Sequence, residues 1–321
     1  MLVAAIQMNS GASRERNLER AAELLRRAAN AGVRLAALPE NFSCMVAPGQ
    51  PLENAEEDGH GPVQDFLATQ ARTCGMWIVG GTLPIRATGS LSDLSDRREP
   101  DERARTDFHD FEAHSPDYVT RNRGNMDRYP TGAVDRTQVR QAPGRAFAAC
   151  CVYDERGQRI ARYDKIHLFD VELSTGESYR ESERLAAGDA AQRVLVDTPA
   201  GRTGLSVCYD LRFPELFRAL SSLGAGVFAV PSAFTETTGR AHWETLLRAR
   251  AIENLAFVIA PGQTGEHPGG RRTFGHSMIV GPWGEVLAVV PEGEGLAIAE
   301  LDAARQERLR REFPVLTHRR L

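Results

Sequence analysis

The sequence predicts an α/β protein, because short apolar segments alternate with amphipathic ones from the N-terminus onward. Residues 2–6 are an apolar run, residues 17–30 repeat apolar side chains at helical spacing, and residues 33–38 are apolar again. A second helical segment at 62–74 and a strand at 76–81 complete the order strand, helix, strand, helix, strand. In such an order the strands are typically covered by helices.

The second half of the chain repeats this alternation. Residues 147–153 and 159–163 predict a hairpin around the turn at 154–157. A polar loop is expected from Phe169 to Gly188, and residues 193–207 lead through a strand to Cys208. After Cys208, helices are expected at 214–223 and 242–253, and strands at 226–230, 256–260, 276–280 and 286–290. The chain thus predicts two β-α-β halves of similar construction.

Residues 86–145 interrupt the pattern. They contain 11 arginines and 11 acidic residues, and their few aromatic residues follow no sustained period. A loop of this length is uncommon inside a compact domain. We interpret it as an inserted, largely disordered surface segment within a single domain of residues 1–321. A lid over a binding site is the functional alternative.

The charge balance gives no indication of a surface that binds nucleic acid or a membrane. There are 39 basic and 43 acidic residues, so the net charge is −4. We expect no export signal and no membrane span, because no apolar run is long enough. The five cysteines are an odd number without CxxC spacing, which is typical of reduced thiols in a cytoplasm.

Glu40, Lys165 and Cys208 each stand at the end of a predicted strand, where ligands bind in α/β sheets. Lys165 is the only lysine among the 39 basic residues. Glu40 would take the thiol proton, Cys208 would attack, and Lys165 would stabilise an oxyanion. The strand-to-helix turn at Cys208 is expected to favour a thiolate. Taken singly, each residue could also be structural: Glu40 and Lys165 could lie at the surface or cap a helix, and Cys208 could be a buried cysteine that only packs in the core.

Three segments carry a resemblance to a known family. LPENF around Glu40, RYDKIHLFD around Lys165 and GLSVCYDLRFPEL around Cys208 are similar to the Glu-Lys-Cys set of the nitrilase superfamily of carbon–nitrogen hydrolases. The resemblance implies a four-layer α-β-β-α sandwich, a homodimer or larger homo-oligomer, and neither metal nor cofactor. It also implies a second glutamate between the lysine and the cysteine. SYRESERLAAGD assigns this role to Glu181, with Glu177 and Glu183 as weaker candidates.

Residues 230–254 and 271–288 resemble the Nit branch of this superfamily, which implies hydrolysis of deaminated glutathione. Close ω-amidase relatives show Gly-Ala-Phe-Asn where this chain has Ser232-Ala233-Phe234-Thr235, which favours the former activity. The resemblance therefore implies a metal-free thiol amidase. It would convert the primary amide of a small carboxylated substrate to a carboxylate and ammonia through a Cys208 thioester.

Four residues are expected to contact this amide substrate: Tyr209, Arg212, Phe234 and Thr235. Arg212 would pair with a substrate carboxylate, because arginine binds carboxylates through two hydrogen bonds. A structural ion pair with Asp210 or another acid explains Arg212 equally well.

Four other functions compete with this interpretation. An ω-amidase acting on 2-oxoglutaramate would use the same residues. A papain-like Cys-His enzyme would need one of His167, His242 or His276, none of which has a local signature. A metallohydrolase would need spacing such as HExxH, which the sequence lacks. An inactive scaffold would use residues 86–145 to bind a partner.

Overall fold

The computed structural model describes residues 1–47, 52, 54–87, 145–173 and 176–320. Residues 1–86 and 144–321 form one compact unit, which contains every element below. The expected insertion at 86–145 lies outside the described residues from 88 to 144. At its ends, Arg86 is the last residue of a strand and Arg145 directly precedes another.

The first sheet has seven strands within the described residues, in the order β17-β1-β2-β3-β5-β4, with β6 paired to β5. Strands β1, β2 and β3 run parallel, and the remaining pairs are antiparallel. The members are β1 Leu2–Gln7, β2 Leu35–Ala37, β3 Trp77–Val79, β4 Leu83–Arg86, β5 Ala146–Tyr153, β6 Arg159–Asp164 and β17 Gly295–Glu300.

The second sheet has six strands in the described part of the chain, in the order β16-β15-β12-β11-β10-β9. Its central strands β10, β11 and β12 are parallel, so each sheet is built around three parallel strands as the two predicted halves require. The members are β9 Leu195–Thr198, β10 Gly201–Leu205, β11 Val227–Ala229, β12 Phe257–Ala260, β15 Ser277–Val280 and β16 Val286–Val290.

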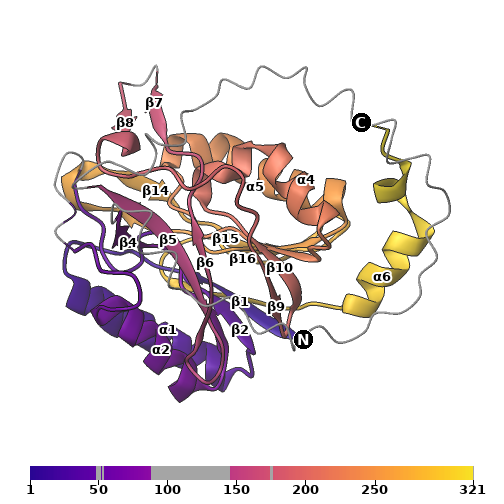
Figure 1. Cartoon of the computed structure of the whole chain (residues 1–321), viewed down its shortest axis with the longest axis horizontal. Helices are drawn as coiled ribbons and strands as arrows, with labels where there is room; N and C mark the ends of the chain where they lie inside the picture. Colours follow the sequence, from indigo (N-terminus) through magenta and orange to yellow (C-terminus); the bar gives the residue numbers. More distant parts are fainter. Residues whose placement is uncertain (48–51, 53, 88–144, 174–175, 321) are drawn as a thin grey trace, which may run out of the picture. The chain divides into compact units, whose positions relative to one another are not determined.

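Helices cover the outer faces of both sheets, which gives four layers (Figure 1). α1 (Arg14–Asn30) and α2 (Pro62–Cys74) pack on the first sheet, and α4 (Pro214–Ser222) and α5 (Glu236–Asn254) on the second. The alternation of side chains along a strand explains this arrangement. In β1, Ala4 and Ile6 join the cluster under α1 and α2, whereas Val3 and Ala5 join the cluster with the second sheet.

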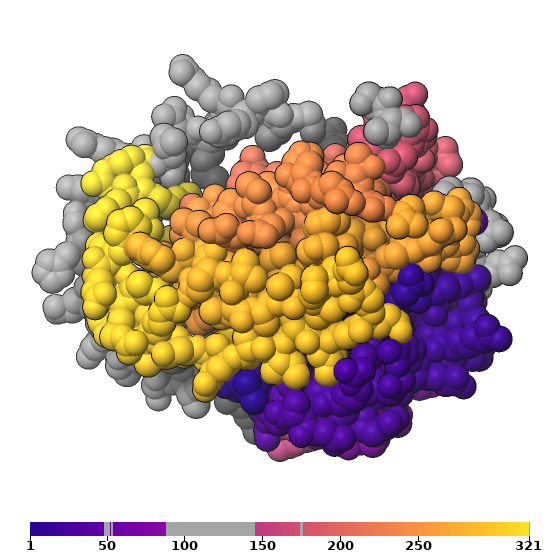
Figure 2. Space-filling model, turned by 180° about the vertical axis from the view of Figure 1, so that it is seen from behind, coloured from indigo at the N-terminus to yellow at the C-terminus, as the bar shows by residue number. Residues whose placement is uncertain are grey.

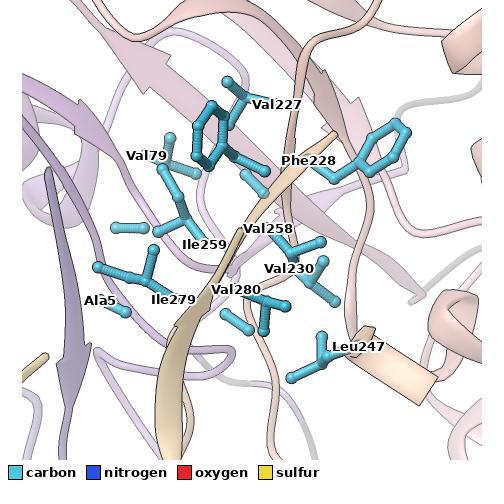
Figure 3. Packing of buried hydrophobic residues seen from close by; sticks show 14 of the residues in the cluster. Ala5, Val79, Val227, Phe228, Val230, Leu247, Val258, Ile259, Ile279 and Val280 are labelled. Carbon is cyan, nitrogen blue, oxygen red and sulfur yellow. The ribbon is translucent and has the colours of Figure 1, made fainter. Parts of the chain in front are cut away.

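The same alternation builds the core of the second sheet (Figure 3). Ile259 and Ile279 point toward Ala5 and Val79 of the first sheet. Phe228 points to the helical side, where its ring lies 5.1 Å from that of Phe217 in α4. Burial of each such side chain stabilises the fold by roughly 1.5–3 kcal/mol, so these contacts hold the strand ends in place.

The C-terminal segment joins both halves. β17 pairs with β1 along its whole length, from Leu2↔Glu300 to Gln7↔Gly295. Figure 2 shows this face, with the last residues in yellow beside the indigo N-terminal part. In α6 (Ala303–Glu312), Gln306 Nε2 donates hydrogen bonds to the carbonyl oxygens of Gly226 and Leu255 in the second half.

Several predicted boundaries are wrong. α5 begins at Glu236 instead of residue 242, because Thr235 caps it by accepting a hydrogen bond from the Thr238 N–H. The expected loop after Phe169 contains the hairpin β7 (Asp170–Glu172) and β8 (Ser178–Arg180). A second hairpin, β13 (Thr264–Glu266) and β14 (Arg272–Phe274), is not predicted, nor are β4, β17 and α6.

Candidate active site

The structure brings Glu40, Lys165 and Cys208 together at one edge of the two sheets. Glu40 follows β2 and Lys165 follows β6 in the first sheet, while Cys208 follows β10 in the second. All three are buried, with exposed fractions of 2% for Glu40, 1% for Lys165 and 7% for Cys208. Each therefore lies at a strand end, as the sequence predicts.

Lys165 lies between two carboxylates. Its Nζ donates to Glu40 Oε1 at 2.8 Å and to Glu181 Oε1 and Oε2 at 3.0 and 2.8 Å. Burial alone would lower the pKa of Lys165, but the charges of Glu181 and Glu40 outweigh it and raise this pKa well above its usual value. Lys165 is therefore a fixed ammonium ion at neutral pH.

Glu181 opens a short 3₁₀ turn, η4 (Glu181–Glu183), and its carboxylate also accepts the Phe169 N–H at 2.8 Å. Burial favours the neutral acid, yet Lys165 and these hydrogen bonds hold the pKa of Glu181 below its usual value. The two weaker candidates lie elsewhere. Glu177 accepts hydrogen bonds from Tyr179 and Thr237, and Glu183 is exposed.

Cys208 has a strained backbone and a neutral thiol. Its φ is 49°, a left-handed value that costs a non-glycine residue about 1–2 kcal/mol. Burial, followed by the charge of Glu40, raises the pKa of Cys208 well above that of an ordinary thiol, although Lys165 opposes this. The expected thiolate is therefore wrong. α4 begins only at Pro214, and the residues from Cys208 to Arg212 form a separate 3₁₀ turn, η5.

Asp210 connects the turn of Cys208 to the segment that carries Lys165. Its fully buried carboxylate accepts the Val207 N–H at 2.9 Å and the Tyr163 hydroxyl at 2.7 Å. The other oxygen accepts the His167 N–H at 3.0 Å and lies 2.7 Å from His167 Nδ1. These contacts occupy Asp210, so the structural ion pair considered for Arg212 does not form with it.

The four expected substrate contacts line one pocket with Cys208. Arg212 lies over the rings of Tyr209 and Phe234, at 5.6 and 5.2 Å from their centroids. Its Nη1 is 3.2 Å from His242 Nδ1, and within the described residues it forms no ion pair with a carboxylate. The Thr235 hydroxyl also caps α5, a role that is not predicted from the sequence.

None of the three histidines considered for a Cys-His enzyme is hydrogen-bonded to Cys208 in the described part of the chain. His167 binds Asp210 and stacks on Phe213 at 3.7 Å. His242 lies against Arg212. His276 stacks on Phe274 at 4.0 Å, with its Nδ1 3.0 Å from the Phe274 carbonyl oxygen.

Sequence reasoning missed Arg271, which lies between the Cys208 pocket and a larger cavity of about 220 Å³. Its Nη2 donates to the Ala233 carbonyl oxygen at 2.7 Å, and its guanidinium lies 5.4 Å from the ring centroid of Tyr179. Arg271 follows the short η6 turn (Pro268–Gly270), so no strand-end signal in the sequence marks it.

The fold and this site define the class of the protein. The chain belongs to the carbon–nitrogen hydrolase family, whose model matches residues 2–95 and 131–311. It is a hydrolase of carbon–nitrogen bonds other than peptide bonds, and the expected four-layer nitrilase-type fold is confirmed.

The chain is similar to three known members of this superfamily. Deaminated glutathione amidase of Synechocystis sp. (strain PCC 6803 / GT-S) is 37% identical over 99% of this chain and 97% of its own length. The C. elegans NitFhit protein is 32% identical with a TM-score of 0.72, over 99% of this chain and 65% of that chain. Saccharomyces cerevisiae Nit3, a member of branch 10 of the nitrilase superfamily, is 26% identical with a TM-score of 0.74, over 100% and 97%.

Proposed function

We propose that the protein is a thiol amidase in which Cys208 is the nucleophile, Glu40 the general base and acid, and Lys165 the oxyanion donor. The observation that carries this proposal is the position of the Lys165 ammonium between Glu40 and Glu181, beside the Cys208 thiol. Glu181 is a positioning residue, because its bidentate contact fixes the direction of the Lys165 side chain.

Acylation begins from a neutral thiol. Glu40 takes the Sγ proton while the sulfur attacks the amide carbon, so a free thiolate is not required. The amide oxygen becomes an oxyanion, which the charge of Lys165 stabilises; one N–H leaves the bidentate contact with Glu181 and turns toward this oxygen, while a second keeps the contact. When the tetrahedral intermediate collapses, the carbon–nitrogen bond breaks and Glu40 returns the proton to the leaving nitrogen. A thioester on Cys208 and a neutral amine result.

Deacylation uses the same groups. Glu40 takes a proton from a water molecule as its oxygen attacks the thioester carbon, and Lys165 again stabilises the oxyanion. The carbon–sulfur bond then breaks, the sulfur regains a proton from Glu40, and the acyl group leaves as a carboxylic acid, which releases its remaining proton to solvent as a carboxylate. Glu40, Lys165 and Cys208 are all buried, which keeps their relative positions through both steps.

Deaminated glutathione is the substrate we propose, and Arg212 supports it. Among the described residues Arg212 pairs with no carboxylate, so it is placed to bind the 2-oxo acid end of the acyl chain. The scissile γ-amide of this substrate is secondary and its leaving group is cysteinylglycine, so the expected primary amide and release of ammonia are wrong for deaminated glutathione. Release of ammonia would occur only from a primary amide such as 2-oxoglutaramate.

One experiment distinguishes the two candidate substrates. The purified protein is incubated with deaminated glutathione or 2-oxoglutaramate, and 2-oxoglutarate, free amine and ammonia are measured. We expect a higher kcat/KM for deaminated glutathione, with equal amounts of 2-oxoglutarate and cysteinylglycine. A preference for 2-oxoglutaramate would make the protein an ω-amidase, and loss of neither amide would make it a scaffold.

We further propose a cytoplasmic homodimer or larger homo-oligomer made of one hydrolase domain that residues 86–145 interrupt. All five cysteines are free, which supports a reducing compartment. No helix of the described residues is long and apolar enough to cross a bilayer.

Exposed apolar side chains support self-association, notably Ile252 at 47%, Trp283 at 53% and Phe313 at 49%. Trp283→Glu should yield monomers in analytical ultracentrifugation.

A further inference from the structure

The larger cavity adjoins the Cys208 pocket but contains none of Glu40, Lys165 and Cys208. Its volume is about 220 Å³, and it shares Phe169, Glu181 and Arg271 with the Cys208 pocket. The pocket at Cys208 is much smaller, about 10 Å³. An amide substrate has an acyl side and an amine side, so a second space next to the nucleophile can take one of them.

The walls of this cavity carry positive charge. Arg184 and Arg271 are both partly buried, and Arg180 lies at the exposed rim, where it faces Glu172 at 3.9 Å. Burial is the main cause that lowers the pKa of Arg184; the charge of Glu181 opposes this effect, and the like charge of Arg271 adds to it. Of the two acids in the cavity wall, Glu181 is paired with Lys165 and Glu183 is exposed.

Arg271 also has unused hydrogen-bonding capacity. Within the described residues its Nε is buried and has no hydrogen-bond partner, whereas its Nη2 donates to the Ala233 carbonyl oxygen. A buried donor without a partner costs about 1–3 kcal/mol. A carboxylate in the cavity would accept from this edge of the guanidinium and would reduce its repulsion with Arg184.

We propose that this cavity binds the amine side of the substrate, and that Arg271 and Arg184 recognise a carboxylate at the end of that leaving group. The inference rests on the proposed amidase function and deepens it: the enzyme acts on secondary amides whose leaving group is a short, acidic peptide. Asn41 and Asn54 in the same wall offer amide groups to a peptide bond. Arg212, beside Cys208, remains for the acyl side.

Three amides with the same 2-oxoglutaryl acyl group test this assignment. The first is deaminated glutathione, the second carries a carboxamide in place of its terminal carboxylate, and the third is 2-oxoglutaramate. We expect the wild-type protein to prefer the first over the second by about ten- to a hundredfold in kcat/KM. Arg271→Gln and Arg184→Gln should each reduce this preference to within about threefold.

The matched control is Arg272→Gln, because Arg272 is exposed and paired with Glu236 and Glu266 outside the cavity. This variant should keep the wild-type preference. A loss of structure around Ala233 would slow the hydrolysis of all three amides equally. The ratio of kcat/KM between the first and the second amide would then stay unchanged. A wild-type protein without preference, or variants that retain it, would overturn the inference while leaving the amidase in place. Failure of the proposed function is separate, because the wild type would then hydrolyse none of the amides.

Discussion

At the scale of single residues, the site depends on one buried cation between two carboxylates, those of Glu40 and Glu181. Lys165 pairs with both Glu40 and Glu181, at 2.8 Å in each case, and its positive charge offsets the repulsion between the two carboxylates. Removing one partner of a buried ion pair typically lowers the free energy of unfolding by about 3–5 kcal/mol. The geometry of the ammonium is therefore as important as its charge.

Lys165→Arg tests this point, because it keeps the charge and changes the shape. The planar guanidinium is too wide for the space that Nζ occupies between the two carboxylates. We expect a folded protein whose kcat falls about a hundredfold or more, which is typical of a lost oxyanion donor. Circular dichroism and steady-state kinetics measure both effects. Arg162→Lys, at a partly buried arginine paired with Asp58 and Asp164, serves as the control.

Glu40→Gln distinguishes two effects of Glu40, its influence on the pKa of Cys208 and its role as the catalytic base. Burial is the main reason for the high pKa of Cys208, and the negative charge of Glu40 is the next. Removing that charge stabilises the thiolate, so the pKa of Cys208 should fall, while turnover should disappear with the base. Thiolate absorbance as a function of pH, relative to Cys208→Ser, gives the pKa. An unchanged or higher pKa in Glu40→Gln would contradict the electrostatic description, and Glu244→Gln on the exposed face of α5 should change neither quantity.

At the scale of elements, the turn after β10 depends on Asp210. Its two oxygens accept from groups on both sides of the site, the Val207 N–H and the His167 N–H among them. The carboxylate therefore holds the strained φ of Cys208 and aligns the turn with the segment after β6. Asp210 does not contact the reacting atoms, so we regard it as a positioning residue.

Asp210→Asn places an amide N–H against one of these donors. We expect a loss of about 1–3 kcal/mol in the free energy of unfolding. We also expect kcat to fall about a hundredfold with little change in KM, because misplacement of the nucleophile affects the chemical step. Urea unfolding and kinetics measure the two effects. If kcat stays at the wild-type value in a destabilised protein, Asp210 is only structural; Glu215→Gln, on the exposed start of α4, is the control.

The elements also show what the sequence can predict. α2 is found at the predicted residues because both of its ends carry strong signals, Pro62 in the first turn and Gly75 at a φ of 58°. β17 has six residues and alternating burial, but its partner β1 lies at the other end of the chain, so no local pattern marks this pairing. The strand-end rule located Glu40, Lys165 and Cys208, whereas Arg271 reaches the site through a tertiary contact with Ala233. The acidity of Cys208 depended on burial, which the sequence does not reveal.

At the scale of the molecule, the chain leaves and re-enters the first sheet at adjacent points. β4 and β5 are antiparallel neighbours, and Arg86 pairs with Ala146. The ends of the segment 88–144 are thus joined by a ladder that a two-residue turn can close. This geometry supports the proposal of one domain with an insertion.

Replacing residues 88–144 by Asn-Gly should therefore give a stable hydrolase. Asn-Gly fits the tight turn that connects two antiparallel strands. We expect kcat/KM within about twofold of the full chain, since surface loops tolerate large changes in length. Kinetics and thermal unfolding of both proteins are compared. A folded but inactive protein would instead identify the segment as part of the site, as the lid alternative predicts.

The central claim is that the acyl group passes through a thioester on Cys208. Hydroxylamine tests it most directly, because this nucleophile competes with water for a thioester during turnover of deaminated glutathione. We predict that the wild-type protein forms the 2-oxoglutaryl hydroxamate in proportion to hydroxylamine, while cysteinylglycine is still released, and that Cys208→Ala forms neither product. Turnover without any hydroxamate, or hydroxamate formed by Cys208→Ala, would contradict the claim.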